Sequence, residues 1–263
     1  MDARRLRRTR GAAHGATPRA ARAGRLAGVR TSPRTIPRAG AMSLLSPARG
    51  YALWAPTYSE TAVSALESSV VGALGVPLRG RRVLDVGCGI ARRLADARDA
   101  GASVALGVDL APAMLARASG DALLAAADVR ALPIADGAFD VVWCRLVLGY
   151  VDDLSAAYAE LARACAPGGV VLVTDFHPTA AAAGHRRTFR DDAGELHELE
   201  NHVHQADAHP EAAARVGLSL RQRRDGVVSD TVRDFYARAG RLDAYGDQIG
   251  LPLVLAMLFV RDD

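Results

Sequence analysis

The chain has 263 residues, half of them hydrophobic, and a formal net charge of +4. This length suffices for one large α/β domain with a continuous core and makes a second full domain unexpected. The longest apolar run, from Leu251 to Val260, is far shorter than the roughly 20 residues needed to cross a bilayer, so no membrane span is predicted.

The first residues differ in composition from the rest of the chain. Residues 1–50 hold twelve arginines against a single acid, Asp2, and the remainder is acidic. Because residues 1–46 also lack hydrophobic periodicity, we predict that they form a disordered Arg-rich extension. The folded domain is predicted over residues 47–263. Because Met42 directly precedes the first globular-looking residues, a start codon assigned too early is one interpretation of residues 1–41. Targeting and nucleic-acid attachment are the others.

The first element expected in the folded domain is an amphipathic helix. Ser59 is a candidate for its N-cap, and Gly75 marks its end. One face of this helix is apolar and carries Val63, Leu66, Val70 and Leu74. Tyr58, just before the helix, is either a residue that closes over a ligand or one half of a packed pair with Trp54.

Residues 83–91 read VLDVGCGIA and predict a strand, a tight glycine turn and a helix. The run ending at Val86 suits a buried strand, while Gly87 and Gly89 let bare backbone approach a ligand. Leu94 and Ala97 recur at helical spacing after the turn. This arrangement is typical of nucleotide-like cofactor binding.

A second apolar strand ends at Asp109, 24 residues beyond Asp85. An acid at this offset is suited to accept two ribose hydroxyl protons. The alternative is that Asp109 caps a helix whose first turn holds Pro112.

Four further strands are predicted: one over residues 139–144, one that ends at Asp175, one over 218–223 and one over 251–260. A helix is predicted over residues 230–239. Residues 186–198 predict a hairpin around Asp192 to Gly194. It lies within an insertion, residues 179–216, that we expect to cover the substrate site.

The glycine turn resembles the first motif of the class I S-adenosylmethionine-dependent methyltransferases, D-x-G-x-G-x-[GA], met by Asp85, Gly87, Gly89 and Ala91. Three further matches follow in order, GVDLAPAML, AADVRALPIADGAFDVVWCRLVLGY and LARACAPGGVVLVTDFHP. An NAD(P)-dependent oxidoreductase is the alternative enzyme, but the third glycine of its fingerprint is replaced by Arg92. A catalytically silent cofactor-binding module is the alternative outside enzymes.

The resemblance implies an α/β, Rossmann-like fold with a seven-stranded, mostly parallel sheet, helices on both faces and an antiparallel last strand. S-adenosyl-L-methionine is the implied cofactor. Asp109 would hold its ribose and Asp128 its adenine amino group, while Val129 would offer a backbone donor and Arg145 would lie beneath its methionine moiety. The full set of implied cofactor-binding residues is Tyr58, Asp85, Gly87, Cys88, Gly89, Asp109, Leu110, Met114, Asp128, Val129 and Arg145.

Methyl transfer needs donor and acceptor in line, and a base helps where the acceptor carries a proton. His177, after the strand that ends near Asp175, is the first candidate base, with Asp175 on the same side of an extended chain. The alternative is a loop histidine that makes a local hydrogen bond before Pro178.

No metal site is predicted. Asp152 and Asp153 suggest magnesium, but a helical stripe begins directly after them and favours an N-cap. His202 and His204 suggest zinc, but no cysteine accompanies them. Asn201 and His202 remain candidates for lining the acceptor pocket.

The substrate class follows from what the motifs lack. WCRLVL replaces the [DNS]-P-P-[YF] element of base and amide N-methyltransferases, and a lysine-free chain cannot form the lysine-dependent tetrad of RNA ribose methyltransferases. We therefore expect a small-molecule methyl acceptor and no nucleic acid. Cys88, Cys144 and Cys165 have no metal or disulfide spacing, which favours reduced thiols in the cytoplasm.

Overall fold

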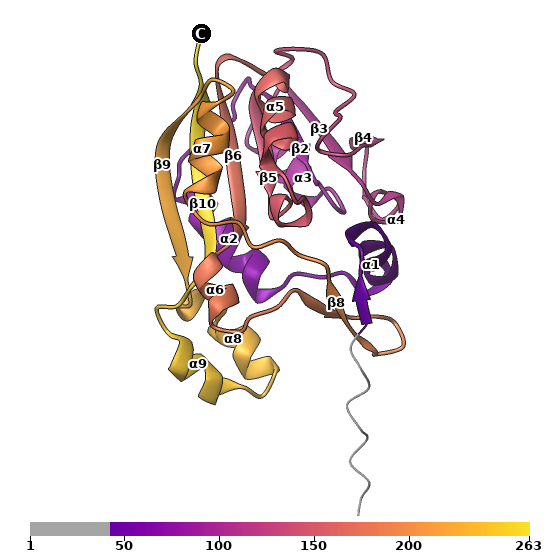
Figure 1. The fold of residues 1–263 in the computed structure, drawn as a ribbon. Coiled ribbons are helices and arrows are strands. Elements are labelled where there is room, and N and C mark those ends of the chain that lie inside the picture. The colour runs from indigo at the N-terminus through magenta and orange to yellow at the C-terminus, as the bar shows by residue number, and fades with distance from the viewer. Residues whose placement is uncertain (1–42) are drawn as a thin grey trace, which may run out of the picture. The chain divides into compact units, whose positions relative to one another are not determined.

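The computed structural model describes residues 43–263 (Figure 1). The extension predicted over residues 1–46 therefore lies outside the described residues up to residue 42. Residues 43–45 form strand β1 (Ser43–Leu45), so the folded part begins earlier than its composition predicts. Leu45 is buried with Phe189 and Leu199, and this apolar burial stabilises the short strand.

The central sheet has seven strands in the order β4-β3-β2-β5-β6-β10-β9. The first five strands pair in parallel, and β10 runs antiparallel to both β6 and β9. This confirms the predicted Rossmann-like architecture. The strands are β2 (Arg82–Val86), β3 (Val104–Asp109), β4 (Leu123–Ala126), β5 (Phe139–Arg145), β6 (Cys165–Phe176), β9 (Leu218–Val227) and β10 (Pro252–Arg261).

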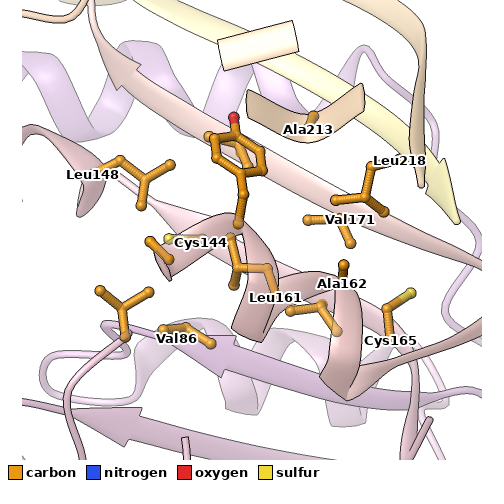
Figure 2. Close-up of a cluster of buried hydrophobic side chains, with 14 of the residues drawn as sticks. Val86, Cys144, Leu148, Leu161, Ala162, Cys165, Val171, Ala213 and Leu218 are labelled. Carbon is orange, nitrogen blue, oxygen red and sulfur yellow. The ribbon is translucent and has the colours of Figure 1, made fainter. Parts of the chain in front are cut away.

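Helices cover both faces of this sheet, because successive side chains of a buried strand point to opposite faces. Leu84 and Val86 face a cluster that includes α5 (Leu154–Ala164) and α7 (Ala208–Ala214), drawn in Figure 2. Val83 faces the other cluster, with α2 (Ala62–Gly72) and α3 (Arg92–Asp99). The near-continuous apolar strands thus have both faces buried.

A second, three-stranded sheet has the order β1-β8-β7. Strands β7 (Thr188–Arg190) and β8 (Leu196–Leu199) form the predicted antiparallel hairpin. Helix α1 (Pro47–Trp54) contacts β8, as Figure 1 shows. The remaining elements are η1 (Ala55–Thr57), α4 (Pro112–Leu115), η2 (Leu148–Tyr150), α6 (Pro178–Ala182), α8 (Asp230–Arg238) and α9 (Leu242–Gln248).

Two predicted helix caps have different outcomes. Thr61, not Ser59, caps α2, and it forms a capping box in which the Thr61 and Ser64 side chains each accept the other residue's backbone N–H. Asp153 caps α5, since its Oδ1 accepts the Ser155 N–H at 2.9 Å. Among residues 43–263, no helix is long and apolar enough to cross a bilayer.

We predict that Gly87→Ala destabilises the protein more than Gly80→Ala. Both glycines have nearly the same positive φ, +75° and +74°, which costs an alanine about 1–2 kcal/mol. A Cβ at Gly87 would lie 2.1 Å from Val147 Cγ2, whereas nothing lies within 4 Å at Gly80. Overpacking adds about 1–3 kcal/mol. Urea unfolding measures both variants, and equal losses would contradict the close packing at Gly87.

Candidate functional site

A cavity of about 650 Å³ opens at the carboxyl ends of the parallel strands. Its volume is within the range of small-molecule and cofactor sites. One part of the wall comes from the segments that follow β2, β3, β4 and β5. The other part comes from α1 and its neighbours and from the insertion around residues 185–188. Crevices at these strand ends are where α/β sheets bind ligands.

The glycine turn, residues 87–89, brings bare backbone to the cavity wall. Gly87 and Gly89 both have positive φ, which only glycine adopts readily. A Cβ at Gly89 would meet Met114 Cε at 3.4 Å. A side chain at this turn would therefore reduce the space available to a ligand at the cavity wall.

Asp109 lies on the cavity wall at the end of β3. Its Oδ2 accepts the Gly89 N–H and its Oδ1 accepts the Ala111 N–H, both at 2.8 Å. Burial raises the pKa of Asp109, and these two donors oppose the shift. Each oxygen keeps a lone pair for a hydroxyl donor such as a ribose. The capping alternative is wrong, because Ala111 is the N-cap of α4.

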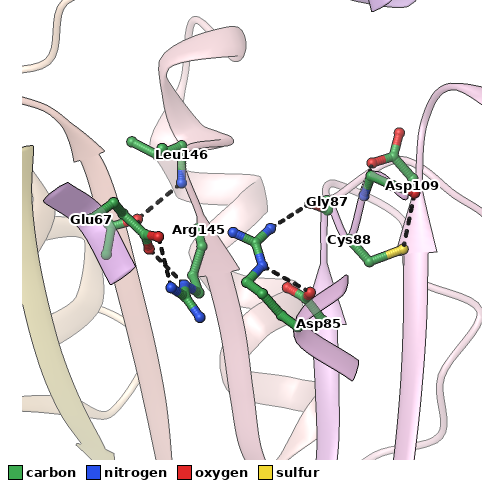
Figure 3. Close-up of polar contacts among 10 residues, drawn as sticks. Glu67, Asp85, Gly87, Cys88, Asp109, Arg145 and Leu146 are labelled. Atoms are coloured by element: carbon green, nitrogen blue, oxygen red, sulfur yellow. Dashed lines mark hydrogen bonds and ion pairs between the residues drawn. The ribbon is translucent and has the colours of Figure 1, made fainter. Parts of the chain in front are cut away.

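Asp85 does not line the cavity, contrary to its predicted direct contact with the cofactor. Its carboxylate, labelled in Figure 3, is fully buried. Its charge is compensated by Arg93, whose Nε lies 3.2 Å from Oδ2. Arg93 Nη2 also donates to the Gly87 carbonyl at 3.1 Å. Burial raises the pKa of Asp85, while Arg93 lowers it. Asp85 thus stabilises the glycine turn indirectly, by holding Arg93 against the Gly87 carbonyl.

Arg145 borders the cavity as predicted, but its charge is already neutralised by Glu67. The two side chains share two hydrogen bonds, at 2.5 and 2.7 Å, and both are buried (Figure 3). Thr174 Oγ1 donates to the same carboxylate at 3.0 Å. Burial raises the pKa of Glu67, but Arg145, together with Arg93 and Thr174, lowers it by more, so the net shift is downward. Sequence reasoning missed Glu67, whose only signal is an acid on a mostly apolar helix.

The other predicted cofactor residues, Tyr58, Cys88, Leu110, Met114, Asp128 and Val129, line the cavity. Asp128 is ion-paired with Arg130 at 2.7 Å, and hydrogen bonds from Arg130 lower the pKa of Asp128. Tyr58 packs edge-on against Trp54 with ring centroids 4.8 Å apart. The packed pair is present and forms part of the wall, while closure of Tyr58 over a ligand stays a prediction.

Asp175 and His177, the predicted catalytic pair, do not line the cavity, whereas Phe176 between them does. Side chains alternate along an extended chain, so a residue on the cavity side places both neighbours on the opposite side. Asp175 lies 3.4 Å from His209, and His177 lies 3.8 Å from Asp225. His177 Nδ1 accepts the Thr179 N–H, the local role given as the alternative. The catalytic prediction for this pair is not supported.

Three of the remaining histidines lie next to one another, with ring centroids 6.4 Å apart for His202 and His204 and 5.8 Å apart for His204 and His209. Within residues 43–263 no group of three or more His, Cys, Asp or Glu side chains is arranged to hold a metal. His204 Nε2 lies 2.9 Å from the Val151 carbonyl, and His197 pairs with Asp191. Asn201 and His202, predicted to line the acceptor pocket, are not on its wall.

Several wall residues were not predicted from sequence. Tyr51, Tyr150, His185 and Arg187 line the cavity. Two further wall residues, Ala91 of the glycine motif and Leu146 next to Arg145, come from motifs named in the sequence and have φ of 61° and 59°. These are the two non-glycine residues with positive φ in the described part of the chain. Such strained backbone is concentrated at functional sites in proteins.

Fold and cavity together define a Rossmann-like α/β protein that holds a nucleotide-type cofactor at its strand ends. Comparison with known families is specific about the cofactor. Residues 84–173 match the family described as "Methyltransferase domain". Residues 84–173 therefore form a class I S-adenosylmethionine-dependent methyltransferase domain, with S-adenosylmethionine as the cofactor of its site.

Relatives and solved structures agree with this family. The chain is 30% identical over 174 residues to malonyl-[acyl-carrier protein] O-methyltransferase of Dechloromonas aromatica, covering 63% of this chain and 61% of that protein. It is 29% identical over 230 residues to 27-O-demethylrifamycin SV methyltransferase of Amycolatopsis mediterranei, covering 74% and 83%.

An S-adenosylmethionine-dependent methyltransferase from Mesorhizobium loti has the same fold, with a TM-score of 0.60 and 22% identity over 76% of this chain and 100% of that one.

The sequence match to the malonyl-carrier-protein relatives spans less than two thirds of their own length, 39% in one and 61% in another.

We predict that Asp109→Ala weakens binding of S-adenosylmethionine and S-adenosylhomocysteine about 10- to 100-fold. The change removes a charged acceptor, which contributes about 1.5–3 kcal/mol, and frees the Gly89 N–H. Calorimetry on the full chain measures both affinities. Asp121→Ala, at an exposed acid away from the cavity, is the control. Unchanged affinity in Asp109→Ala, or tight NADH binding without S-adenosylmethionine binding, would contradict the assignment.

Proposed function

We propose that the protein transfers a methyl group from S-adenosylmethionine to a small-molecule acceptor by in-line displacement. The observation that carries this proposal is one continuous cavity with two kinds of wall. The glycine turn, Asp109 and Asp128 form the wall suited to an adenosine. Aromatic and basic side chains from α1, η2 and the insertion form the wall that we assign to the acceptor.

When bound, the cofactor supplies a methyl group on a sulfonium, which is already a good leaving group. The chain's own residues therefore have to align the acceptor and exclude water. We assign the covering of the acceptor to Tyr51 and Trp54 of α1 and to the insertion, of which residues 185–188 and Leu199 line the cavity. This supports the domain assignment in which that insertion closes the substrate site.

An oxygen atom is the acceptor atom that the comparisons favour. The two reported relatives are named as a malonyl-carrier-protein O-methyltransferase and a 27-O-demethylrifamycin SV methyltransferase. A small organic acceptor also suits a cavity of about 650 Å³ better than a nucleic acid does. Three buried free cysteines are consistent with the reducing cytoplasm that we propose as the location.

His185 replaces His177 as the proposed proton acceptor. Its imidazole borders the cavity, and its Nε2 is buried without a hydrogen-bond partner among residues 43–263. Burial lowers the pKa of His185, and nearby Arg241 lowers it further. The ring is then neutral at pH 7, the state in which it can take a proton from an acceptor hydroxyl.

Transfer of label from methyl-tritiated S-adenosylmethionine to a panel of small hydroxyl and carboxyl compounds tests the function. We expect S-adenosylhomocysteine to form only when an acceptor is present and to be lost in Asp109→Ala. Cofactor binding without turnover across the whole panel would instead favour the silent cofactor-binding module. An NAD(P)-dependent oxidoreductase is not supported, since the matched family is a methyltransferase domain.

We predict that His185→Ala lowers kcat at least tenfold, whereas His177→Ala changes it less than twofold. A positioned base contributes roughly 10²- to 10⁴-fold. Because the pKa of His185 is lowered, its neutral form persists to more acidic pH than for an ordinary histidine. The wild-type kcat should therefore rise with pH below the usual histidine range and then level off. Equal losses in both variants would overturn this role.

A further inference from the structure

The arginines on the cavity wall differ in whether a carboxylate neutralises them. Arg93, Arg130, Arg145 and Arg186 each form an ion pair, with Asp85, Asp128, Glu67 and Glu198 respectively. Arg187 forms none with any carboxylate among residues 43–263, and it is partly buried. Arg92 also lacks a partner in that range, but it is exposed on the first turn of α3. Arg187 is therefore the partly buried cavity arginine left without a counterion.

The hydrogen bonds of Arg187 fix its position and leave part of it free. Its Nε and Nη2 donate to the Tyr150 hydroxyl at 3.2 and 2.9 Å. A guanidinium carries five N–H donors, so three remain, including both on Nη1. No side chain within residues 43–263 accepts from them.

Among the described residues, the Tyr51 hydroxyl is a further free hydrogen-bond donor. The Tyr150 oxygen accepts two N–H groups from Arg187, which occupies both of its lone pairs. In its 2.9 Å contact with Tyr51, Tyr150 must therefore be the donor and Tyr51 the acceptor. Burial holds the pKa of Tyr51 well above its ordinary value, so its hydroxyl keeps its proton. That proton has no acceptor among the described residues.

The free donors of Arg187 and Tyr51 lie close together. Arg187 Nη2 and the Tyr51 oxygen are each 2.9 Å from the same Tyr150 oxygen. The three residues come from the insertion, α1 and η2, so three distant parts of the chain meet at this point. Because no group in the described part of the chain accepts from these donors, they remain available to a ligand in the cavity.

We propose that Arg187 and the Tyr51 hydroxyl bind a carboxylate of the methyl acceptor, with Tyr150 holding both in place. A carboxylate matches the planar fork of a guanidinium and accepts the hydroxyl as well. One free guanidinium balances a single negative charge, which favours a carboxylate over a phosphate dianion. Around it, Trp54 stacks on Phe189 and meets Tyr58, so the rest of the acceptor is mainly apolar. This inference rests on the proposed function, because it defines that function's acceptor.

A matched pair of probes tests the inference on the full chain saturated with S-adenosylhomocysteine. 3-Phenylpropionate carries the carboxylate, and 3-phenylpropionamide has nearly the same shape without the charge. Ligand-observed NMR titration gives both affinities. We expect wild type to bind the carboxylate at least tenfold more tightly than the amide.

Three variants locate the source of that preference. Arg187→Met should abolish it, and Tyr51→Phe, which keeps the ring, should reduce it severalfold. Arg187→Lys should restore it in part, since a lysine supplies charge without the fork. Arg186→Met is the matched control, because this exposed neighbour already pairs with Glu198, and it should keep the full preference. Affinity for S-adenosylhomocysteine should stay within twofold of wild type in all of these variants.

Each contrary outcome has a distinct meaning. A wild type that binds both probes equally, or an Arg186→Met variant that also loses the preference, would overturn the carboxylate site. So would a parallel loss of S-adenosylhomocysteine affinity in Arg187→Met, because the arginine would then serve the cofactor's own carboxylate. Failure of wild type to bind S-adenosylhomocysteine would instead overturn the proposed function, and this inference with it.

Discussion

The hydrogen bond from the Gly89 N–H to Asp109 is the interaction on which the rest of the site depends. It joins the glycine turn after β2 to the end of β3, two neighbouring strands of the sheet. Arg93 holds the turn from its other side, through Asp85 and the Gly87 carbonyl. Charge-assisted bonds of this kind are about twice as strong as neutral ones. The bare peptide at the cavity wall therefore keeps its shape without a ligand, which reduces the ordering cost of binding.

Most of the positive charge around the cavity is balanced by carboxylates. Around the cavity most arginines are matched by a carboxylate, and the deepest pair, Glu67 with Arg145, lies almost entirely out of solvent. Pairs of this kind add little net stability, but removing one partner leaves a buried charge and costs about 3–5 kcal/mol. The matched arginines therefore maintain the wall and leave its net charge almost unchanged. The charge that acts on a ligand comes mainly from the partly buried wall groups without a counterion among residues 43–263, Asp109 and Arg187.

The sequence could predict features that follow local backbone rules. The glycine turn, the acid at the end of β3 and the hairpin of β7 and β8 each depend on residues a few positions apart. Glu67 and Arg145 lie 78 residues apart, so no spacing rule could pair them. Asp175 and His177 were misplaced for a different reason. Their positions at the end of β6 were correct, but the face they point to is decided by Phe176, whose ring takes the cavity side.

The absence of lysine affects the site beyond composition. Each basic side chain at the cavity apart from histidine is an arginine, which stays protonated throughout the physiological range and bonds through a planar fork. The planar guanidinium of Arg145 makes two hydrogen bonds to Glu67. In Arg187 the Nε and Nη2 groups bond to Tyr150, and the Nη1 group, without an acceptor among the described residues, stays free for a ligand. We assign acceptor binding to Arg187, whose charge is fixed, and proton removal to His185, whose pKa is lowered by burial and by Arg241. Lowering the pH below the usual histidine range would then slow the second step, while the charge that serves the first step stays constant.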